Sequence, residues 1–236
     1  MTDFEPTFWR RRHLSRRALI NLSAGLAVVA TATSWGLLRP ALAQKKAAAG
    51  RAEIPLEELM QAGPLPELVL GKEDAAITMV EYASMTCGHC AAFHNKVFPA
   101  LKEKYIDTGK VRFFMREFPL DKLAVAASML ARCAGGDRTL ALISALFAKQ
   151  DEWAFVRGNP VPELFKFGKQ AGFTQESFDK CLTDQKLMDD IVKIRSRAAD
   201  SFGVASTPTF FINGKKMTGA PTLEEFDKAF SALLKS

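Results

Sequence analysis

The tetrapeptide CGHC at Cys87–Cys90 constrains this chain more than any other stretch, because it separates a strand pattern from a helix pattern. The preceding residues 76–84 are rich in residue types that favour a buried strand. After the motif, apolar residues recur every four positions, as on one face of a helix, at Phe93, Val97, Leu101 and Tyr105. The two thiols are therefore expected where a strand turns into a helix, with Cys87 at or next to the helix N-terminus.

A cysteine at the start of a helix meets unpaired backbone N–H groups and the positive end of the helix dipole, and both stabilise a thiolate. A protonated His89 between the cysteines would add positive charge. We therefore expect Cys87 to be an exposed and acidic thiol, and Cys90 to be more shielded in the first helical turn. Because thiol–disulfide exchange proceeds by thiolate attack, the pattern is typical of a redox-active dithiol.

Two other uses of the CGHC motif stay open at this point. A zinc site normally needs a second pair of ligands, and Cys133 and Cys181 stand alone without neighbouring histidines. A four-ligand cluster that adds His94 to the motif is poorly suited to one helix turn. The first alternative is a metal-binding module, for example one that handles copper. The second is a disulfide with only a structural role in the motif.

The first 43 residues have the composition of an export signal. Five arginines precede an apolar stretch at 18–38, which polar residues dilute. Ala41–Ala43 then forms a small-x-small pattern, which predicts a signal peptide cleaved after Ala43. Ser15–Ile20 resembles a twin-arginine signal, which would export the protein folded, while ordinary secretion stays open. An uncleaved membrane anchor is the alternative, since the apolar run is about long enough to span a bilayer.

The net charge of +6 owes much to this leader. Residues 1–43 carry six arginines and two acidic residues, which leaves 26 basic against 24 acidic residues in the rest of the chain. That near balance predicts no nucleic-acid partner. An exported chain meets an oxidising compartment, where its four cysteines, an even number, can form disulfides.

The remaining patterns predict an α/β sheet layer with a helical block in the middle of the chain. Residues 44–64 are predicted to be mainly a linker, with a short helix near Ile54. Residues 121–202 are predicted to be helical, and Asn213-Gly214 is predicted to be a hairpin turn. Strands are predicted at 68–70, 111–118, 209–212 and 215–217. Four aromatic residues of the helical block are assigned to its core: Trp153, Phe155, Phe165 and Phe167.

Several of these positions together resemble the DsbA-like branch of the thioredoxin superfamily, with a joint spacing far more specific than CxxC alone. In this resemblance Cys87 is the nucleophilic cysteine and Cys90 the resolving one. Glu81 matches the buried acid beneath the dithiol, where it would accept the proton of Cys90 through water. Thr207 and Pro208 match the cis-proline loop, whose backbone would pair with an extended client chain. A solvent-facing acid and a strand-edge proline are the alternatives for Glu81 and Pro208.

The resemblance covers residues 65–236 and implies an α/β thioredoxin fold with an inserted helical domain. It places the thioredoxin-fold domain at 65–120 and 203–236, and the inserted domain at 121–202. It also implies a structural disulfide between Cys133 and Cys181, with two buried free thiols as the alternative. Burial in the helical block is expected to protect that second disulfide from thiolate attack.

The resemblance implies a periplasmic thiol:disulfide oxidoreductase that donates the Cys87–Cys90 disulfide to unfolded or reduced exported proteins. It implies no cofactor, and reoxidation by a membrane oxidase of the DsbB type. Residues 44–66 look too short and broken for a dimerisation domain, so a monomer is expected. The dipeptide Gly88-His89 resembles that of eukaryotic disulfide isomerases more than the Pro-His of DsbA, so an isomerase or reductase is the alternative.

Overall fold

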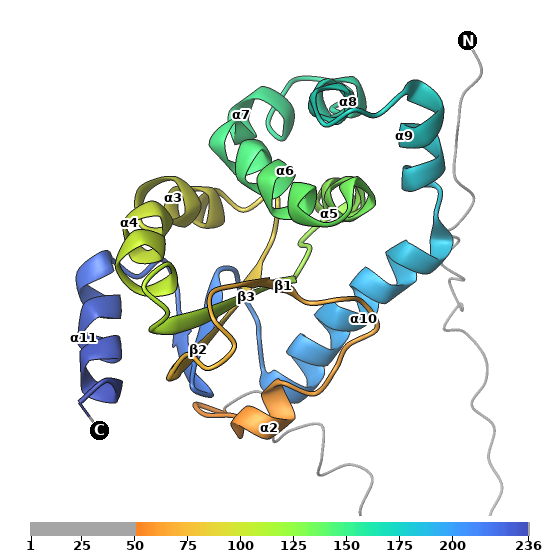
Figure 1. Cartoon of the computed structure of the whole chain (residues 1–236). Helices are drawn as coiled ribbons and strands as arrows, with labels where there is room; N and C mark the ends of the chain where they lie inside the picture. The colour runs from red at the N-terminus through yellow and green to blue at the C-terminus, as the bar shows by residue number, and fades with distance from the viewer. Residues whose placement is uncertain (1–50, 236) are drawn as a thin grey trace, which may run out of the picture. The chain divides into compact units, whose positions relative to one another are not determined.

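The computed structural model describes residues 51–235 (Figure 1). The predicted signal peptide at 1–43, its cleavage site and residues 44–50 of the predicted linker lie outside the described residues. The described part of that linker packs on the sheet, because the apolar side chains of Ile54 and Leu59 are fully buried. It contains the short helix α2 (Leu56–Leu59).

A five-stranded mixed sheet lies at the centre of the fold, in the order β1-β3-β2-β4-β5. Strands β2 and β3 are parallel, and the other neighbouring strands are antiparallel. The strands are β1 (Leu68–Leu70), β2 (Ile77–Ala83), β3 (Val111–Glu117), β4 (Thr209–Ile212) and β5 (Lys215–Thr218). Because β3 and β4 flank β2 on both sides, the strand that leads into the CGHC motif is an interior strand.

The crossover from β2 to β3 begins with α3 (Gly88–Lys96), and Cys87 is the N-cap residue of this helix. Pro99 interrupts the helical run, so α3 is followed by a separate helix α4 (Phe98–Leu101) and a π-helical turn η2 (Lys102–Ile106). The structure thus confirms the predicted strand-to-helix junction at the motif.

The chain between β3 and β4 is helical, and Figure 1 shows α5 to α9 grouped beyond one end of the sheet while α10 leads back along it. The side chains of Asp121 and Thr174 accept backbone N–H groups as the N-caps of α5 and α9. Thr222 caps the start of the last helix, α11 (Leu223–Leu233), in the same way. The helices of the block are α5 (Lys122–Ala134), α6 (Asp137–Ala148), α7 (Gln150–Trp153), α8 (Val161–Gln170), α9 (Gln175–Leu182) and α10 (Gln185–Phe202).

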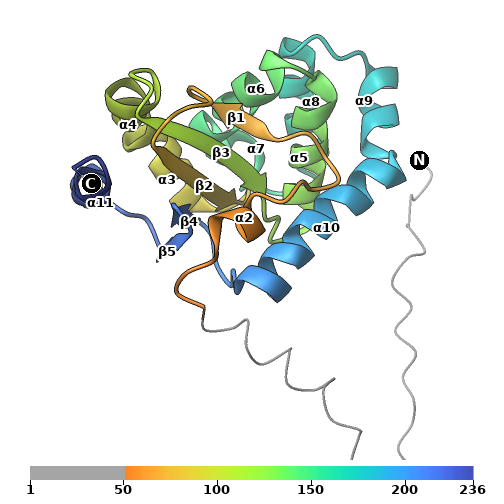
Figure 2. The ribbon, with the colours of Figure 1, turned by 60° about the horizontal axis from the view of Figure 1, so that its bottom comes forward.

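Side chains alternate along β2 between two apolar layers, one on each face of the sheet. Met79 packs into the layer shared with α3 and α11, whereas Val80 and Tyr82 pack into the layer shared with α2 and α10. Figure 2 shows α3 and α10 on opposite sides of the sheet. Glu81 is two residues from Met79, so its side chain belongs to the face that α3 covers.

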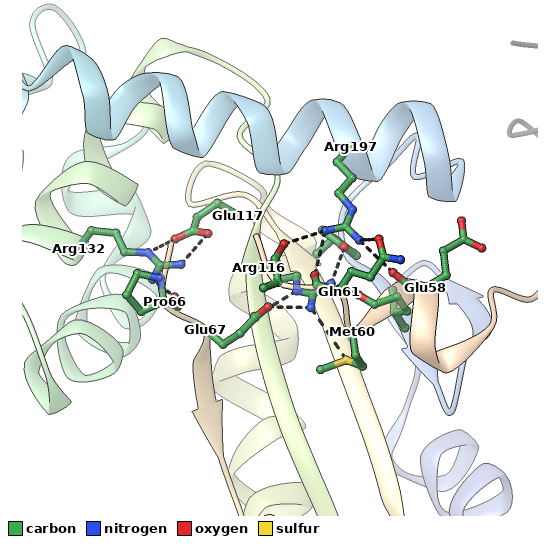
Figure 3. A network of polar contacts seen from close by, with 12 residues as sticks. Glu58, Met60, Gln61, Pro66, Glu67, Arg116, Glu117, Arg132 and Arg197 are labelled. Carbon is green, nitrogen blue, oxygen red and sulfur yellow. Dashed lines mark hydrogen bonds and ion pairs between the residues drawn. The ribbon is translucent and has the colours of Figure 1, made fainter. Parts of the chain in front are cut away.

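Two arginines anchor the segment before β1 to the sheet and to α10 (Figure 3). Arg116 of β3 donates to both carboxylate oxygens of Glu67, at 2.8 and 3.1 Å, and to the carbonyl of Leu59 at 2.7 Å. Arg197 of α10 donates to the carbonyl of Gln61 at 2.9 Å. These charge-assisted bonds supply partners for polar groups that the packing of this segment removes from water.

Candidate active site

The two thiols of the CGHC motif differ in burial because the helix starts between them. Cys87 at the N-cap of α3 keeps 8% of its surface, and Cys90 in the first turn keeps none. We expected an exposed Cys87, and the structure leaves it nearly covered instead. Even so, Cys87 is the residue of the pair that retains some exposed surface.

The surroundings of Cys87 lower the pKa of its thiol to about 5. The largest cause is the hydrogen bond from the Cys90 thiol, and the backbone N–H groups of Cys90 and His89 contribute further. The side chain of His89 is exposed, and this residue acts through its backbone rather than through the ring charge that we expected. The acidity of Cys87 therefore comes mainly from hydrogen bonds in the first turn of the helix.

The pKa of Cys90 is strongly raised. Burial is the largest cause, followed by the hydrogen bond to Cys87 and the negative charge of Glu81. At neutral pH the reduced pair therefore carries a thiolate on Cys87 and a thiol on Cys90, and the thiol stabilises the thiolate.

The loop at Thr207–Pro208 and the helix α7 (Gln150–Trp153) both contact the motif. The Thr207–Pro208 peptide bond is cis, and Sγ of Cys87 lies 3.3 Å from the carbonyl oxygen of Thr207, to which it donates only when protonated. The buried side chain of Gln150, from α7, donates to the carbonyls of Met85 and Cys87 at 2.8 and 3.1 Å. These bonds from the helical block hold the backbone at Cys87 in place. Nothing in the sequence pointed to this role for Gln150.

Glu81 lies beneath the dithiol with no exposed surface, which rules out the solvent-facing alternative. Its Oε2 atom is 2.8 Å from Nε2 of His94, a residue of α3 that we had considered only as a metal ligand. The position of His94, one helical turn after Cys90 on the buried side of α3, is the sequence signal that could have predicted this contact.

Comparison with known proteins places the chain in a family. A family model described as Thioredoxin matches residues 65–232. A crystal structure of Wolbachia pipientis alpha-DsbA1 has a TM-score of 0.69 and 36% identity, and the likeness covers 76% of this chain and 96% of that one. The chain belongs to the thioredoxin family, in its DsbA-like branch.

Further relatives agree with this placement of the DsbA-like chain. A Rickettsia bellii protein described as a protein-disulfide oxidoreductase is 39% identical over 150 residues, which are 63% of this chain and 57% of that protein. The match thus spans little more than half the length of this curated relative. BdbD from Bacillus subtilis, with a TM-score of 0.63 and 23% identity over 72% of this chain and 94% of that one, shares the fold. These likenesses confirm the predicted thioredoxin fold with a helical insertion.

A disulfide joins Cys133, in the last turn of α5, to Cys181 of α9 in this DsbA-like chain. Their Cα atoms are 6.2 Å apart. Cys181 is buried, but Cys133 is exposed, so the burial that we expected to protect this disulfide covers one of its two residues. The difference arises because α5 ends there, before the Gly135-Gly136 turn.

A hollow of about 390 Å³ lies between α3 and α7, beside Gly88 and the side chain of Phe155. Phe155 is 58% exposed, so its assignment to the core was wrong. It follows α7 in the loop before α8, where the chain turns away from the core. Trp153, two residues earlier, is fully buried as predicted.

Residues 51–235 contain no group of three or more His, Cys, Asp and Glu side chains placed to hold a metal ion. His94 in particular is engaged with Glu81. None of the helices within those residues has the length and apolar character needed to cross a membrane.

The hydrogen bond from Cys90 predicts how the acidity of Cys87 responds to mutation. We expect Cys90→Ala to raise the pKa of Cys87, because it removes the largest stabilising contact. His89→Ala keeps the backbone N–H and should change that pKa much less. Titration of the thiolate ultraviolet absorbance against pH measures both variants. A Cys90→Ala midpoint equal to the wild-type midpoint would show that the helix terminus alone makes Cys87 acidic.

Proposed function

We propose that this DsbA-like protein is a thiol:disulfide oxidoreductase that donates its Cys87–Cys90 disulfide to reduced proteins. The observation that carries the proposal is the contrast between the two thiols, a pKa of about 5 at Cys87 and a strongly raised pKa at Cys90. A thiolate stabilised in this way favours the reduced pair, so the disulfide form is an oxidant.

The proposed reaction has two exchange steps. A client thiolate attacks the sulfur of Cys87, the Cys87–Cys90 bond breaks, and Cys90 leaves as a thiolate that takes up a proton. A second client thiolate then attacks the client sulfur of the mixed disulfide and expels Cys87 as a stable thiolate. Two electrons pass from the client to the protein, and the client gains one disulfide.

Other residues of the site would position the client and supply the proton. Glu81 is proposed to exchange the proton of Cys90, which its burial and its electrostatic effect on Cys90 support. The loop at Thr207 and Pro208 lies against Cys87 and is proposed to pair with an extended client. The exposed ring of Phe155 offers an apolar contact near the motif for unfolded clients.

The setting of the reaction is likewise a proposal. The leader pattern at 1–43 and the Cys133–Cys181 disulfide support export to the periplasm, where disulfides persist. Clients would then be reduced exported proteins, and a DsbB-type membrane oxidase would restore the Cys87–Cys90 disulfide. We propose that the protein works as a monomer.

Equilibration of the Cys87–Cys90 pair with glutathione buffers tests the proposed function. Alkylation and mass spectrometry of the quenched mixtures give the reduced fraction at each ratio. A potential well above about −180 mV supports a disulfide donor, a potential near that value favours an isomerase, and one near −270 mV favours a reductase. Failure of the pair to exchange with glutathione at all would contradict every redox function.

A further inference from the structure

His94 and Glu81 form a buried pair beneath the dithiol. The His94 side chain is 6% exposed and the Glu81 side chain is not exposed at all. With Glu81 ionised, Nε2 of His94 donates to Oε2 across 2.8 Å. The other carboxylate oxygen, Oε1, is buried without a hydrogen-bond partner in the described chain. Burying a carboxylate oxygen without a hydrogen bond costs free energy, so this unpaired oxygen calls for a functional explanation.

Aromatic rings hold the imidazole in place. The ring of His94 stacks on Phe147 of α6, with centroids 4.5 Å apart and planes 17° apart, and it also contacts Phe93 and Phe98. Glu81 of β2 is the one ionisable side chain within residues 51–235 that forms an ion pair or hydrogen bond with His94. His94 therefore contacts Glu81 directly, and Glu81 in turn acts on Cys90.

The exchange reaction needs a proton at this place. Cys90 is fully buried, so the thiolate that leaves in the first exchange step must gain a proton inside the protein. The negative charge of Glu81 acts on Cys90, which places the carboxylate within electrostatic reach of the sulfur. Because Glu81 has no exposed surface, a proton given up by its carboxyl group must be replaced through a neighbour. His94 is that neighbour and retains some exposure.

We propose that His94 is a positioning residue of the exchange reaction, which holds Glu81 beneath Cys90 and exchanges with solvent the proton that Glu81 and Cys90 share. When the Cys87–Cys90 bond breaks, the Glu81 carboxylate takes a proton from the His94 imidazolium and passes it to the Cys90 thiolate. Glu81 is then ionised again, and the neutral His94 imidazole regains a proton from solvent. The same proton moves in reverse when Cys90 attacks a mixed disulfide. This inference rests on the proposed function.

The test follows the attack of Cys90 on a mixed disulfide. Reduced protein is mixed with oxidised glutathione and quenched with acid, and mass spectrometry separates the glutathione adduct at Cys87 from the final disulfide. His94→Phe keeps a ring on Phe147, and His94→Gln keeps an N–H group for Glu81 but cannot titrate. We expect both variants to resolve the adduct roughly 10- to 100-fold more slowly than wild type and to lose its pH dependence.

Matched variants separate the proton role from packing. Asn95 of the same helix donates to the carbonyl of Phe147 at 3.0 Å, so Asn95→Ala loosens the same helix contact without touching Glu81 and should resolve the adduct at the wild-type rate. Glu81→Gln should be as slow as His94→Gln, and the double variant no slower than either single one. Wild-type resolution rates in His94→Gln over the whole pH range would overturn the inference.

Two further measurements keep the inference testable. Formation of the adduct is the attack of the Cys87 thiolate, in which Glu81 and His94 transfer no proton, so it should proceed at the wild-type rate in every folded variant of these two residues. Slow formation in wild type would instead count against the proposed function. If the His94 variants do not fold, the inference is tested by the ring ¹⁵N signals of His94 in the wild-type protein. These signals should titrate differently in the oxidised and reduced forms, and identical titrations would overturn the inference.

Discussion

Cys90→Ser is expected to accumulate mixed disulfides with proteins that carry disulfides, all of them attached through Cys87, whose thiolate attacks the client disulfide and expels one client sulfur as a thiolate. The variant keeps the attacking thiol, whose pKa is lowered to about 5, and loses the thiol that resolves the adduct. Serine also keeps a hydroxyl that can donate to the Cys87 thiolate, so the nucleophile should stay acidic. Cys87→Ser is expected to abolish exchange, because Cys90 is fully buried and its pKa is strongly raised.

Non-reducing electrophoresis of the reduced variant with a disulfide-containing client, followed by peptide mass spectrometry, measures these adducts. Cys90→Ala serves as the matched control, because it also lacks the resolving thiol but removes the hydrogen bond to Cys87. Below a pH of about 5 the thiolate of Cys87 is lost, so adduct formation by Cys90→Ser should fall as the pH drops through that range, provided serine maintains the low pKa. Adducts on Cys90 in Cys87→Ser, formed at comparable rates, would reverse the roles assigned here.

Local patterns in the sequence predicted the junction at the motif, and the family resemblance implied the burial of Glu81. A buried strand and an apolar helix face on either side of CGHC leave one geometry for the thiols. Glu81 stands in an otherwise apolar strand, and the structure shows that this strand lies inside the sheet. Tertiary packing overrode neither expectation.

Contacts between distant elements could not be predicted in the same way. The pairing of His94 with Glu81 depends on how α3 lies across β2, and the bonds from Gln150 depend on how α7 lies against the motif. Phe155 and Cys133 lie at helix ends, where one residue decides whether a side chain faces the core or solvent. Composition alone assigned both to the interior.

Removal of the Cys133–Cys181 disulfide is expected to lower the stability of the protein while it retains exchange through Cys87. The bridged residues are 48 apart in the sequence. Loss of such a cross-link costs about 4 kcal/mol as an upper guide, because the unfolded chain regains conformational freedom. For a chain of this size, that corresponds to a fall in melting temperature of roughly 8 to 16 °C. Thermal unfolding of Cys133→Ala/Cys181→Ala under oxidising conditions measures it.

The single variants separate the cross-link from packing. Cys133 is exposed and should contribute little by its side chain alone, whereas Cys181 packs with Met129 and Ile191. Cys133→Ala is therefore expected to show most of the loss seen in the double variant, and Cys181→Ala somewhat more than Cys133→Ala. Wild-type protein with this disulfide selectively reduced should melt near Cys133→Ala. If Cys133→Ala melts at the wild-type temperature, the disulfide does not stabilise the fold, and its place in the helical block needs another explanation.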